Sequence, residues 1–310
     1  MQYYFAPLEG ITDRIYRRLH CRYFPGVDRY YTPFFSPTVH RALTPREALE
    51  LPPAEHWGVA TVPQVLTKVP EDMLWMAQVC RDLGYEQINL NLGCPSGTVT
   101  AKGKGAGMLR TPEELDLFLN AVFSQSPLPI SVKTRLGFEK AEEFVPLLEI
   151  FNRYPICELI VHPRVRADFY KGQVDISMFG YALEHSRAPV CYNGDLLSQA
   201  DIVSLSRQFP GVKAVMLGRG LVGDPGMLSP AGTAPETLAD FMEELLEEYT
   251  AGFGGSRNAM FRLKENWQYI LRRFPTAPKL EKALRKTTDV SEYRQIVSQI
   301  IEAYTLNVNG

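Results

Sequence analysis

Short β-rich runs alternate with helical stretches along most of the chain, and this alternation restricts the folds that the chain can adopt. Branched and aromatic residues predict eight strands, at residues 3–6, 29–32, 58–66, 87–91, 130–134, 159–162, 190–193 and 212–217. The spacing of apolar residues predicts helices between most of them, at residues 13–21, 71–83, 112–123, 141–152 and 198–208. Strands separated by helices are typical of a parallel sheet with crossover connections.

Eight such units favour a closed (β/α)8 TIM barrel over an open, doubly wound α/β sheet. An open sheet usually has fewer strands and a Gly-x-Gly-x-x-Gly turn after its first strand, and no such turn follows the first predicted strand here. A barrel of roughly 250 residues leaves room for an appendage in a chain of 310 residues. We therefore expect a TIM-barrel domain at residues 1–235 and a small all-helical domain at residues 236–310.

Cysteine usage and charge exclude several classes of protein. The five cysteines are odd in number and widely spaced, without a Cys-x-x-Cys pair, so neither a disulfide framework nor a metal site is expected. A reducing, cytoplasmic location fits this pattern best. The start of the chain lacks a basic region before its apolar residues, and no uncharged apolar run is long enough to span a membrane. The net charge of −2 argues against a surface covered with nucleic-acid-binding charge.

Polar and charged residues gather at the predicted strand ends. In a TIM barrel the chemistry takes place at the carboxyl ends of the strands, so these residues are the candidate site. In a purely structural interpretation, Gln64 bonds to the barrel rim, Asp195 caps the next helix and His162 is a buried structural residue. The candidates are Pro7, Leu8, Glu9, Gln64, Asn91, Cys94, Lys133, Arg135, His162, Asn193, Gly194, Asp195, Gly218 and Arg219.

Cys94 and Lys133 are the candidates with the most specific chemistry. Cys94 stands where a strand gives way to a loop, which suits a reactive thiol, but a small buried hydrophobe is an equally good interpretation. Lys133 lies in the strand Ile-Ser-Val-Lys-Thr-Arg and should point into the barrel mouth. A charge there is costly unless it meets an anion, so we expect Lys133 to contact a ligand.

The last two strand ends contain the glycine-rich pieces Asn193-Gly-Asp195 and Gly218-Arg-Gly220. In barrels, the loops after the last two strands often bind phosphate through backbone N–H groups, and Arg219 offers a bidentate contact. A phosphorylated cofactor or substrate is therefore expected. Spacing alone does not distinguish flavin mononucleotide (FMN) from a sugar phosphate.

The charge pattern changes sign beyond Pro235. Residues 236–248 contain six acids and no base, with an apolar stripe at helical spacing. Residues 257–286 contain nine bases and two acids, a difference of +7, with Trp267 and Tyr269 between them. Such a segment is typical of a contact with a nucleic-acid backbone, but a solvated helical face with buried aromatic residues explains it equally well. A last helix is expected at residues 291–304.

Taken together, the strand-end residues resemble the tRNA-dihydrouridine synthases, in the order in which that family carries them. No single piece would suffice, but the set is specific and covers nearly the whole expected barrel. The matching pieces are Ala6-Pro-Leu-Glu-Gly10, Pro63-Gln64, Asn91-Leu-Gly-Cys94-Pro-Ser96, Val99 with Gly105-Ala106 and Leu109, Val132-Lys-Thr-Arg135-Leu-Gly137, His162-Pro-Arg164 with Arg166, Tyr170 and Gly172, Asn193-Gly-Asp195, and Gly218-Arg-Gly220.

The resemblance implies an FMN-bound barrel that reduces the C5–C6 double bond of particular uridines in tRNA, with NADPH as the reductant. It implies that Cys94 gives a proton to C5 while hydride from the flavin reaches C6. A thiol with an ordinary pKa of about 8.5 is largely protonated at neutral pH and can act in this way. Asn91 and Arg135 would hold the flipped uracil. The implied flavin contacts are Pro7, Leu8, Glu9 and Gln64 at the isoalloxazine, Lys133 at its N1/O2 edge, and His162, Asn193, Gly194, Asp195, Gly218 and Arg219 on the ribityl phosphate side.

The basic C-terminal segment lies where this family has its tRNA-binding domain, and it matches by position and charge rather than by motif. Two positions depart from the family pattern: Pro163 stands where glycine is usual, and no aromatic residue follows the Tyr170-x-Gly172 piece. Two other functions remain open. One is an FMN barrel of the dihydroorotate dehydrogenase type, which acts on a free pyrimidine. The other is a non-catalytic RNA-binding protein that keeps the barrel as a scaffold.

Overall fold

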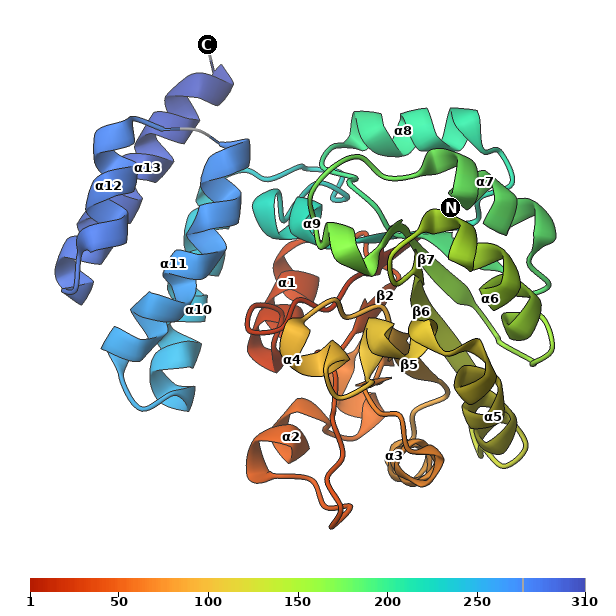
Figure 1. Cartoon of the computed structure of the whole chain (residues 1–310). Helices are drawn as coiled ribbons and strands as arrows, with labels where there is room; N and C mark the ends of the chain where they lie inside the picture. Colours follow the sequence, from red (N-terminus) through yellow and green to blue (C-terminus); the bar gives the residue numbers. More distant parts are fainter. Residues whose placement is uncertain (275, 310) are drawn as a thin grey trace. The chain divides into compact units, whose positions relative to one another are not determined.

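One parallel sheet forms the centre of the structure. The computed structural model describes residues 1–274 and 276–309 (Figure 1). Within these residues, nine strands hydrogen-bond in the order β3-β2-β1-β9-β8-β7-β6-β5-β4, and every neighbouring pair is parallel. The strands are β1 (Gln2–Phe5), β2 (Arg29–Tyr31), β3 (Thr61–Val62), β4 (Gln64–Val65), β5 (Ile88–Leu92), β6 (Ile130–Gly137), β7 (Leu159–Val165), β8 (Val190–Tyr192) and β9 (Ala214–Leu217).

The two end strands of this order, β3 and β4, are separated in the chain only by Pro63, and together they close the sheet into a barrel. β3 pairs with β2 and β4 pairs with β5, so the two ends of the strand order are halves of one run. Proline has no N–H to give to a ladder, but the Pro63 carbonyl accepts a hydrogen bond from Asn89 N at 2.8 Å. The expected (β/α)8 TIM barrel is confirmed, with the predicted strand at residues 58–66 split in two.

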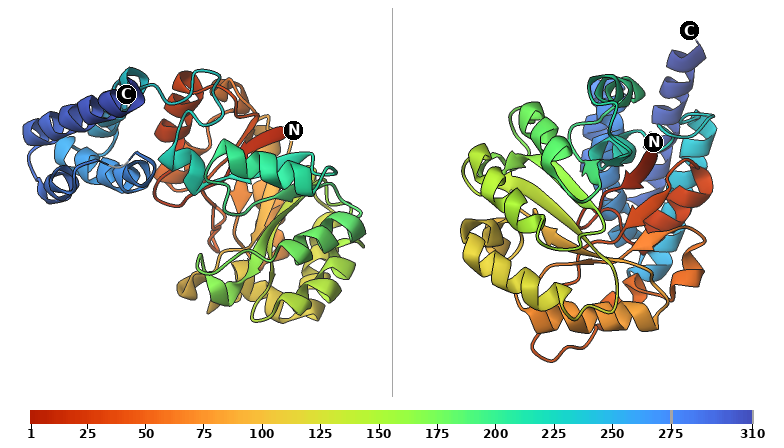
Figure 2. Two further views of the ribbon diagram at one scale, coloured as in Figure 1. Left: turned by 90° about the horizontal axis from the view of Figure 1, so that it is seen from above. Right: turned by 90° about the vertical axis from the view of Figure 1, so that its right-hand side faces the viewer.

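Helices cover the outer face of this sheet (Figures 1 and 2). Two of them begin with proline in the first turn, followed by two acids that suit the positive end of the helix dipole. α7 occupies a connection in which the sequence predicts no helix, and it buries only Phe179 and Ala182, a thin apolar stripe. Among the described residues, no helix combines the length and the apolar character needed to cross a membrane. The covering helices are α3 (Pro70–Asp82), α5 (Pro112–Phe123), α6 (Phe144–Phe151), α7 (Ile176–His185) and α8 (Gln199–Gln208), while α2 (Pro45–Glu50), in the connection between β2 and β3, buries no residue.

β6 and β7 each run three residues past their predicted ends. Arg135 pairs with His162 and Gly137 pairs with Val165, and the register shifts between these two pairs. Pro163 falls at this irregularity, where its missing N–H interrupts no regular ladder. The extension carries buried polar residues to the carboxyl ends of both strands.

The chain divides into two compact units. The barrel unit consists of Met1–Pro7, Asp28–Leu196 and Ala200–Leu217. The helical unit consists of Leu8–Val27, Leu197–Gln199 and the residues from Gly218 onward, so it includes the helix after β1. The predicted domain boundary after residue 235 stays a prediction. The helices of this unit are α1 (Arg14–Tyr23), α9 (Arg219–Gly223), α10 (Pro235–Gly252), α11 (Ser256–Arg273), α12 (Pro278–Lys286) and α13 (Val290–Asn309).

Aromatic side chains fill the core of the helical unit. Trp267 of α11 is 1% exposed and donates from Nε1 to the Tyr293 hydroxyl of α13 at 2.8 Å. Phe241 of α10 packs edge-on against Tyr16 and Phe24. Trp267 is therefore a core residue. This agrees with the interpretation of the basic segment as a solvated helical face with buried aromatic residues.

Candidate active site at the barrel mouth

Gln64, Asn91 and Cys94 are joined by side-chain hydrogen bonds. Gln64 donates from Nε2 to Asn89 Oδ1 at 2.8 Å and accepts at Oε1 from Asn91 Nδ2 at 2.7 Å. Asn91 Oδ1 in turn accepts the backbone N–H groups of Gly93 and Cys94, at 3.0 and 2.9 Å. The amide of Asn91 therefore sets the turn that carries Cys94 out of β5.

The glycine-rich run after Cys94 packs against it. The run forms α4 (Gly97–Thr100) and the 3-10 helix Gly105–Arg110, and Ala106 N donates to the Cys94 carbonyl at 3.1 Å. Gly105 has φ +58°, and a Cβ there would lie 3.0 Å from Cys94 Cβ, so both backbone and space favour glycine. Cys94 itself is half-buried and is not part of a disulfide. The glycine-rich segment is therefore packed against Cys94 and is not an open loop.

Lys133 is a cation without a partner at this site. It pairs in register with Asn91, so the two side chains share one face of the sheet. Within the described part of the chain, its ammonium makes no hydrogen bond or ion pair. Burial, together with the nearby Arg135 charge, lowers the pKa of Lys133 to about 8. An unpaired ammonium held in this way is a ready site for an anionic or electron-rich group.

Arg135 is buried and donates to three backbone carbonyls near the carboxyl ends of β5 and β7. Its Nε donates to Gly93 O at 2.9 Å, its Nη1 to Val165 O at 2.9 Å and its Nη2 to Phe169 O at 2.6 Å. The guanidinium carbon lies 5.3 Å from the centre of the Tyr170 ring. Burial lowers the pKa of Arg135. This side chain therefore orients the Cys94 turn and the segment after β7 at the same time.

Arg164 belongs to the strand-end piece His162-Pro-Arg164, but the sequence alone assigns it no role at the site. It is 1% exposed and donates to the carbonyls of Lys171 and Gly172, at 3.1 and 2.6 Å, and to the Asp195 carboxylate at 2.5 Å. Its Nη1 also lies 3.2 Å from His162 Nε2, so these side chains form one cluster at the ends of β7 and β8. The available signal is a basic residue just past an apolar strand, because a buried guanidinium needs several acceptors.

Asn193 and Gly194 follow β8 directly. Asn193 donates from Nδ2 to Met216 O on the neighbouring strand at 2.8 Å. A Cβ at Gly194 would overlap the Tyr192 ring, so a larger residue fits only if that ring moves. The Tyr192 side chain therefore fills the space beside Gly194, which explains why the smallest residue stands at this strand end.

The remaining five predicted residues lie at positions in the sequence where the chain passes from one unit to the other. Pro7 ends the first segment of the barrel unit, and Leu8, Glu9, Gly218 and Arg219 belong to the helical unit. Glu9 is exposed, and Arg219 is the first residue of α9. The barrel unit thus carries the other nine at its strand ends: Gln64, Asn91, Cys94, Lys133, Arg135, His162, Asn193, Gly194 and Asp195.

Nearly the whole chain matches one protein family. The family model described as "Dihydrouridine synthase (Dus)" matches residues 4–305. The chain belongs to the dihydrouridine synthase family. A probable tRNA-dihydrouridine synthase of Synechocystis is 28% identical over 97% of this chain and 86% of its own length. A tRNA-dihydrouridine(16) synthase of Aquipseudomonas alcaligenes is 30% identical over 96% of this chain and 99% of its own length.

Solved structures support the fold of this family member. A variant of morphinone reductase matches with a TM-score of 0.52 and 9% identity, over 73% of this chain and 85% of its own. A variant of NCR from Zymomonas mobilis matches with a TM-score of 0.50 and 14% identity, over 72% and 83%. At these identities the likeness shows the fold alone.

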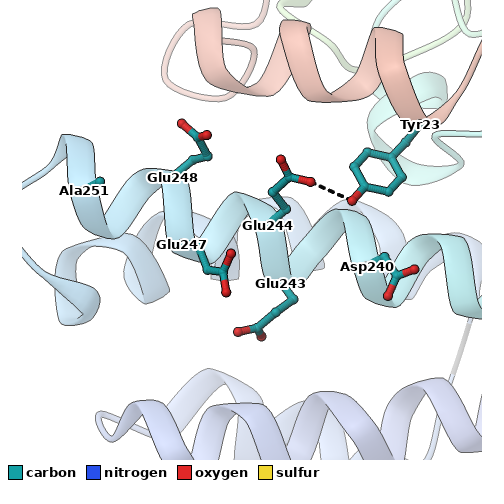
Figure 3. Close-up of a pocket in the computed structure, with 7 residues that line it drawn as sticks. All are labelled: Tyr23, Asp240, Glu243, Glu244, Glu247, Glu248 and Ala251. Carbon is teal, nitrogen blue, oxygen red and sulfur yellow. Dashed lines mark hydrogen bonds between the residues drawn. The ribbon is translucent and has the colours of Figure 1, made fainter.

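In this member of the dihydrouridine synthase family, the helical unit bears an acidic cavity of ≈ 470 Å³ along α10 and the end of α1. Figure 3 shows its five carboxylates along α10, with Glu244 bonded to the Tyr23 hydroxyl. Three of these carboxylates also pair with arginines: Glu243 with Arg294, Glu244 with Arg22, and Glu248 with Arg18. Five carboxylates against three arginines leave the α10 side of the unit acidic.

A second cavity of ≈ 470 Å³ lies between α11 and α12 and is basic. Four bases and one acid line it: Lys264, Arg272, Lys282, Arg285 and Glu281. Among the residues that the structure describes, no carboxylate lies within ion-pair distance of Arg272 or Arg285. A polyanion therefore meets attraction on the α11–α12 side and repulsion on the α10 side.

Proposed function

We propose that the protein is a flavin-dependent tRNA-dihydrouridine synthase with NADPH as its reductant. The reaction adds hydride to C6 and a proton to C5 of a uridine in tRNA. The observation that carries the proposal is the Cys94 thiol on a fixed turn after β5, beside the unpartnered Lys133 of β6, in a chain of this family. The cysteine content fits a cytoplasmic enzyme, which is where we place it.

The residues at the barrel mouth fit FMN. Lys133 would meet the N1/O2 edge of the isoalloxazine, because its ammonium has no carboxylate partner within the described residues and that edge is electron-rich. Gln64 uses one amide hydrogen for Asn89 and keeps the other for the ring. When bound, FMN supplies the hydride for uracil C6. Pro7, Leu8 and Glu9 would line the isoalloxazine, and the ribityl phosphate side would be held by His162, Asn193, Gly194, Asp195, Gly218 and Arg219.

Cys94 acts as the general acid in this proposal. Asn91 and Arg135 fix its turn and the Ala106 N–H binds its carbonyl, so the backbone that carries the thiol is held in place. The S–H bond breaks and a C–H bond forms at C5 of uracil, while C6 receives hydride. Asn91 bonds to Gln64 with one Nδ2 hydrogen and keeps the other for the uracil. Arg135 uses three of its five N–H groups for backbone carbonyls and would hold the uracil with one that remains.

The basic cavity of the helical unit provides the attraction for tRNA. A base that reacts at a barrel mouth must leave its stack, which costs a few kcal/mol that other contacts must offset. Contacts from Lys and Arg to phosphates offset such costs, since they release counterions from the RNA. Arg272 and Arg285 are suited to this role because neither is engaged by a carboxylate within the described residues.

The target that we propose is the uridine at position 16. Two relatives that match almost end to end carry this position in their names: the A. alcaligenes protein and a Pseudomonas putida protein, 28% identical over 98% of this chain and 99% of its own length. The test is to map dihydrouridine by mass spectrometry in tRNA from cells that lack this protein. We expect loss at position 16, restored by the intact protein and not by Cys94→Ala. Loss at another position would overturn only the assigned position, and no loss anywhere would overturn the function.

A further inference from the structure

The turn after β7 carries an aromatic residue where glycine is the usual choice. Phe169 has φ 52° and ψ −101°, and Lys171 N donates to Asp168 O at 2.8 Å. These values match the second residue of a type II′ β-turn, a position with positive φ that glycine dominates. Within the described residues, Arg41 is the one other non-glycine residue with positive φ. A bulky side chain here strains the backbone, which points to a function for the ring.

Two buried arginines hold the strained turn in place. Arg135 Nη2 donates to Phe169 O at 2.6 Å, and Arg164 donates to the carbonyls of Lys171 and Gly172. Both guanidinium groups belong to side chains that are 1% exposed. The turn cannot relax without leaving buried donors unsatisfied, so the strain is built into the site.

The Phe169 ring is exposed and is linked to the Cys94 loop through one side chain. Phe169 is 40% exposed. The Arg166 guanidinium carbon lies 4.9 Å from the centre of the ring, and Arg166 Nε donates to Pro95 O at 3.1 Å, one residue after Cys94. An exposed aromatic ring beside a guanidinium is the kind of surface on which unpaired nucleobases stack.

We propose that Phe169 is a stacking platform for a tRNA base next to the target uridine. The inference rests on the proposed function and adds a substrate contact to it. When the target base leaves its stack, its neighbour loses a stacking partner, and the ring of Phe169 replaces that partner. Phe169 is then a specificity residue, because it acts on the flanking nucleotide and not on the reacting atoms.

Three substitutions separate stacking from a structural role. Phe169→Ala removes the ring and keeps the strain, Phe169→Gly removes both, and Phe169→Tyr keeps both. Leu117→Ala is the control, at a residue of α5 that is 72% exposed. We expect the Ala and Gly variants to bind unmodified tRNA about tenfold more weakly, and the Tyr variant and the control to stay within about twofold. The Gly variant should melt at a higher temperature than the Ala variant, since glycine adopts positive φ without strain.

Two further measurements make the result specific to stacking. A fluorescent adenine analogue, placed next to the target uridine on one side or the other, should be quenched on binding to the parent and not to Phe169→Gly. Affinity and quenching equal to the parent in that variant would overturn the inference. Slower flavin reduction by NADPH without tRNA would also overturn it, because the ring would then contact the reductant. Binding and quenching are measured without turnover, so they test the stacking contact by itself. If the parent protein formed no dihydrouridine, that result would overturn the proposed function and not the stacking contact.

Discussion

Two arginines at the barrel mouth and two arginines of the helical unit are used in opposite ways. In the barrel unit Arg135 and Arg164 are 1% exposed, and their hydrogen bonds go mainly to backbone carbonyls of the loops around the site. In the helical unit Arg22 and Arg294, with side chains 54% and 52% exposed, pair with carboxylates of α10 at the surface. Buried charges fix geometry, whereas exposed charges are screened by salt and act on large charged ligands.

This contrast assigns different parts of the function to the two units. Arg135 and Arg164 hold the turns that carry Cys94 and Phe169, so in the proposed function they fix the position of the reacting groups. The helical unit separates acids on α10 from bases on α11 and α12, so it determines which side attracts a polyanion. Substitutions in either unit can break this contrast.

Replacement of Cys94 should have the largest effect. Cys94→Ala removes the proton donor and keeps the backbone hydrogen bonds of the turn. We expect kcat for dihydrouridine formation to fall about 1,000-fold, with flavin content and tRNA affinity close to the parent. The control is Cys21→Ala, a half-buried thiol of the helical unit, which should keep its kcat. A Cys94→Ala enzyme with parental kcat would remove this thiol from the mechanism.

A matched pair of arginine substitutions tests the contrast itself. Arg164→Gln leaves the Asp195 carboxylate and two loop carbonyls without their donor, so we expect it to lower the free energy of unfolding by about 3 kcal/mol. Arg294→Gln breaks an exposed pair with Glu243 and should cost about 0.5 kcal/mol or less. Urea unfolding of both variants is the measurement. Equal losses would break the distinction between buried and exposed arginines.

Charge reversal in the basic cavity should weaken binding without changing the chemistry. The double variant Arg272→Glu, Arg285→Glu should raise KM for tRNA about tenfold and lower the slope of log affinity against log salt by about 2, because two phosphate contacts are lost. The control is Arg81→Glu, Arg207→Glu, which makes the same charge change at exposed residues of α3 and α8. If both double variants lost affinity equally, net charge and not the cavity would explain binding.

Lys133 should give the smallest effect, and one that depends on pH. Its folded-state pKa of about 8 lies below the ordinary value of 10.5, so the unfolded chain binds more protons between these values and stability rises with pH across that window. Lys133→Met should therefore stabilise the flavin-free protein at pH 7, by on the order of 1 kcal/mol after allowance for solvent at the barrel mouth, and the gain should shrink towards pH 10. Thermal melts of both proteins at several pH values measure it. A gain independent of pH would contradict the burial of this charge.

The sequence predicts the elements of the barrel where the signals are local. The predicted bounds of α5 agree with the structure at both ends, because Pro112 and two acids mark its start. β6 and β7 extend past their predicted ends because Arg135 and Arg164 look like loop residues in sequence. Arg135 is buried only because acceptors arrive from elsewhere, such as Phe169 O, 34 residues further along the chain. Such acceptors depend on tertiary structure, which no local pattern reports.

The candidate site shows the same division. The strand-end rule finds Gln64, Asn91 and Cys94, but the bonds that join them depend on the register of β4 against β5. The cost of a charge at the barrel mouth also predicts that Lys133 contacts a ligand, and its ammonium has no partner within the described residues. The positive φ of Phe169 is not predictable from the sequence, because an aromatic residue inside a turn that contains no glycine gives no sign of it.

The central claim is that this chain reduces uridine within tRNA, and one assay tests it most directly. The purified protein, with its bound flavin, is incubated with NADPH and unmodified tRNA, and dihydrouridine is measured by mass spectrometry. The same preparation is offered free orotate. We expect dihydrouridine in the tRNA and no turnover of the free pyrimidine. Turnover of orotate with none on tRNA would contradict the claim.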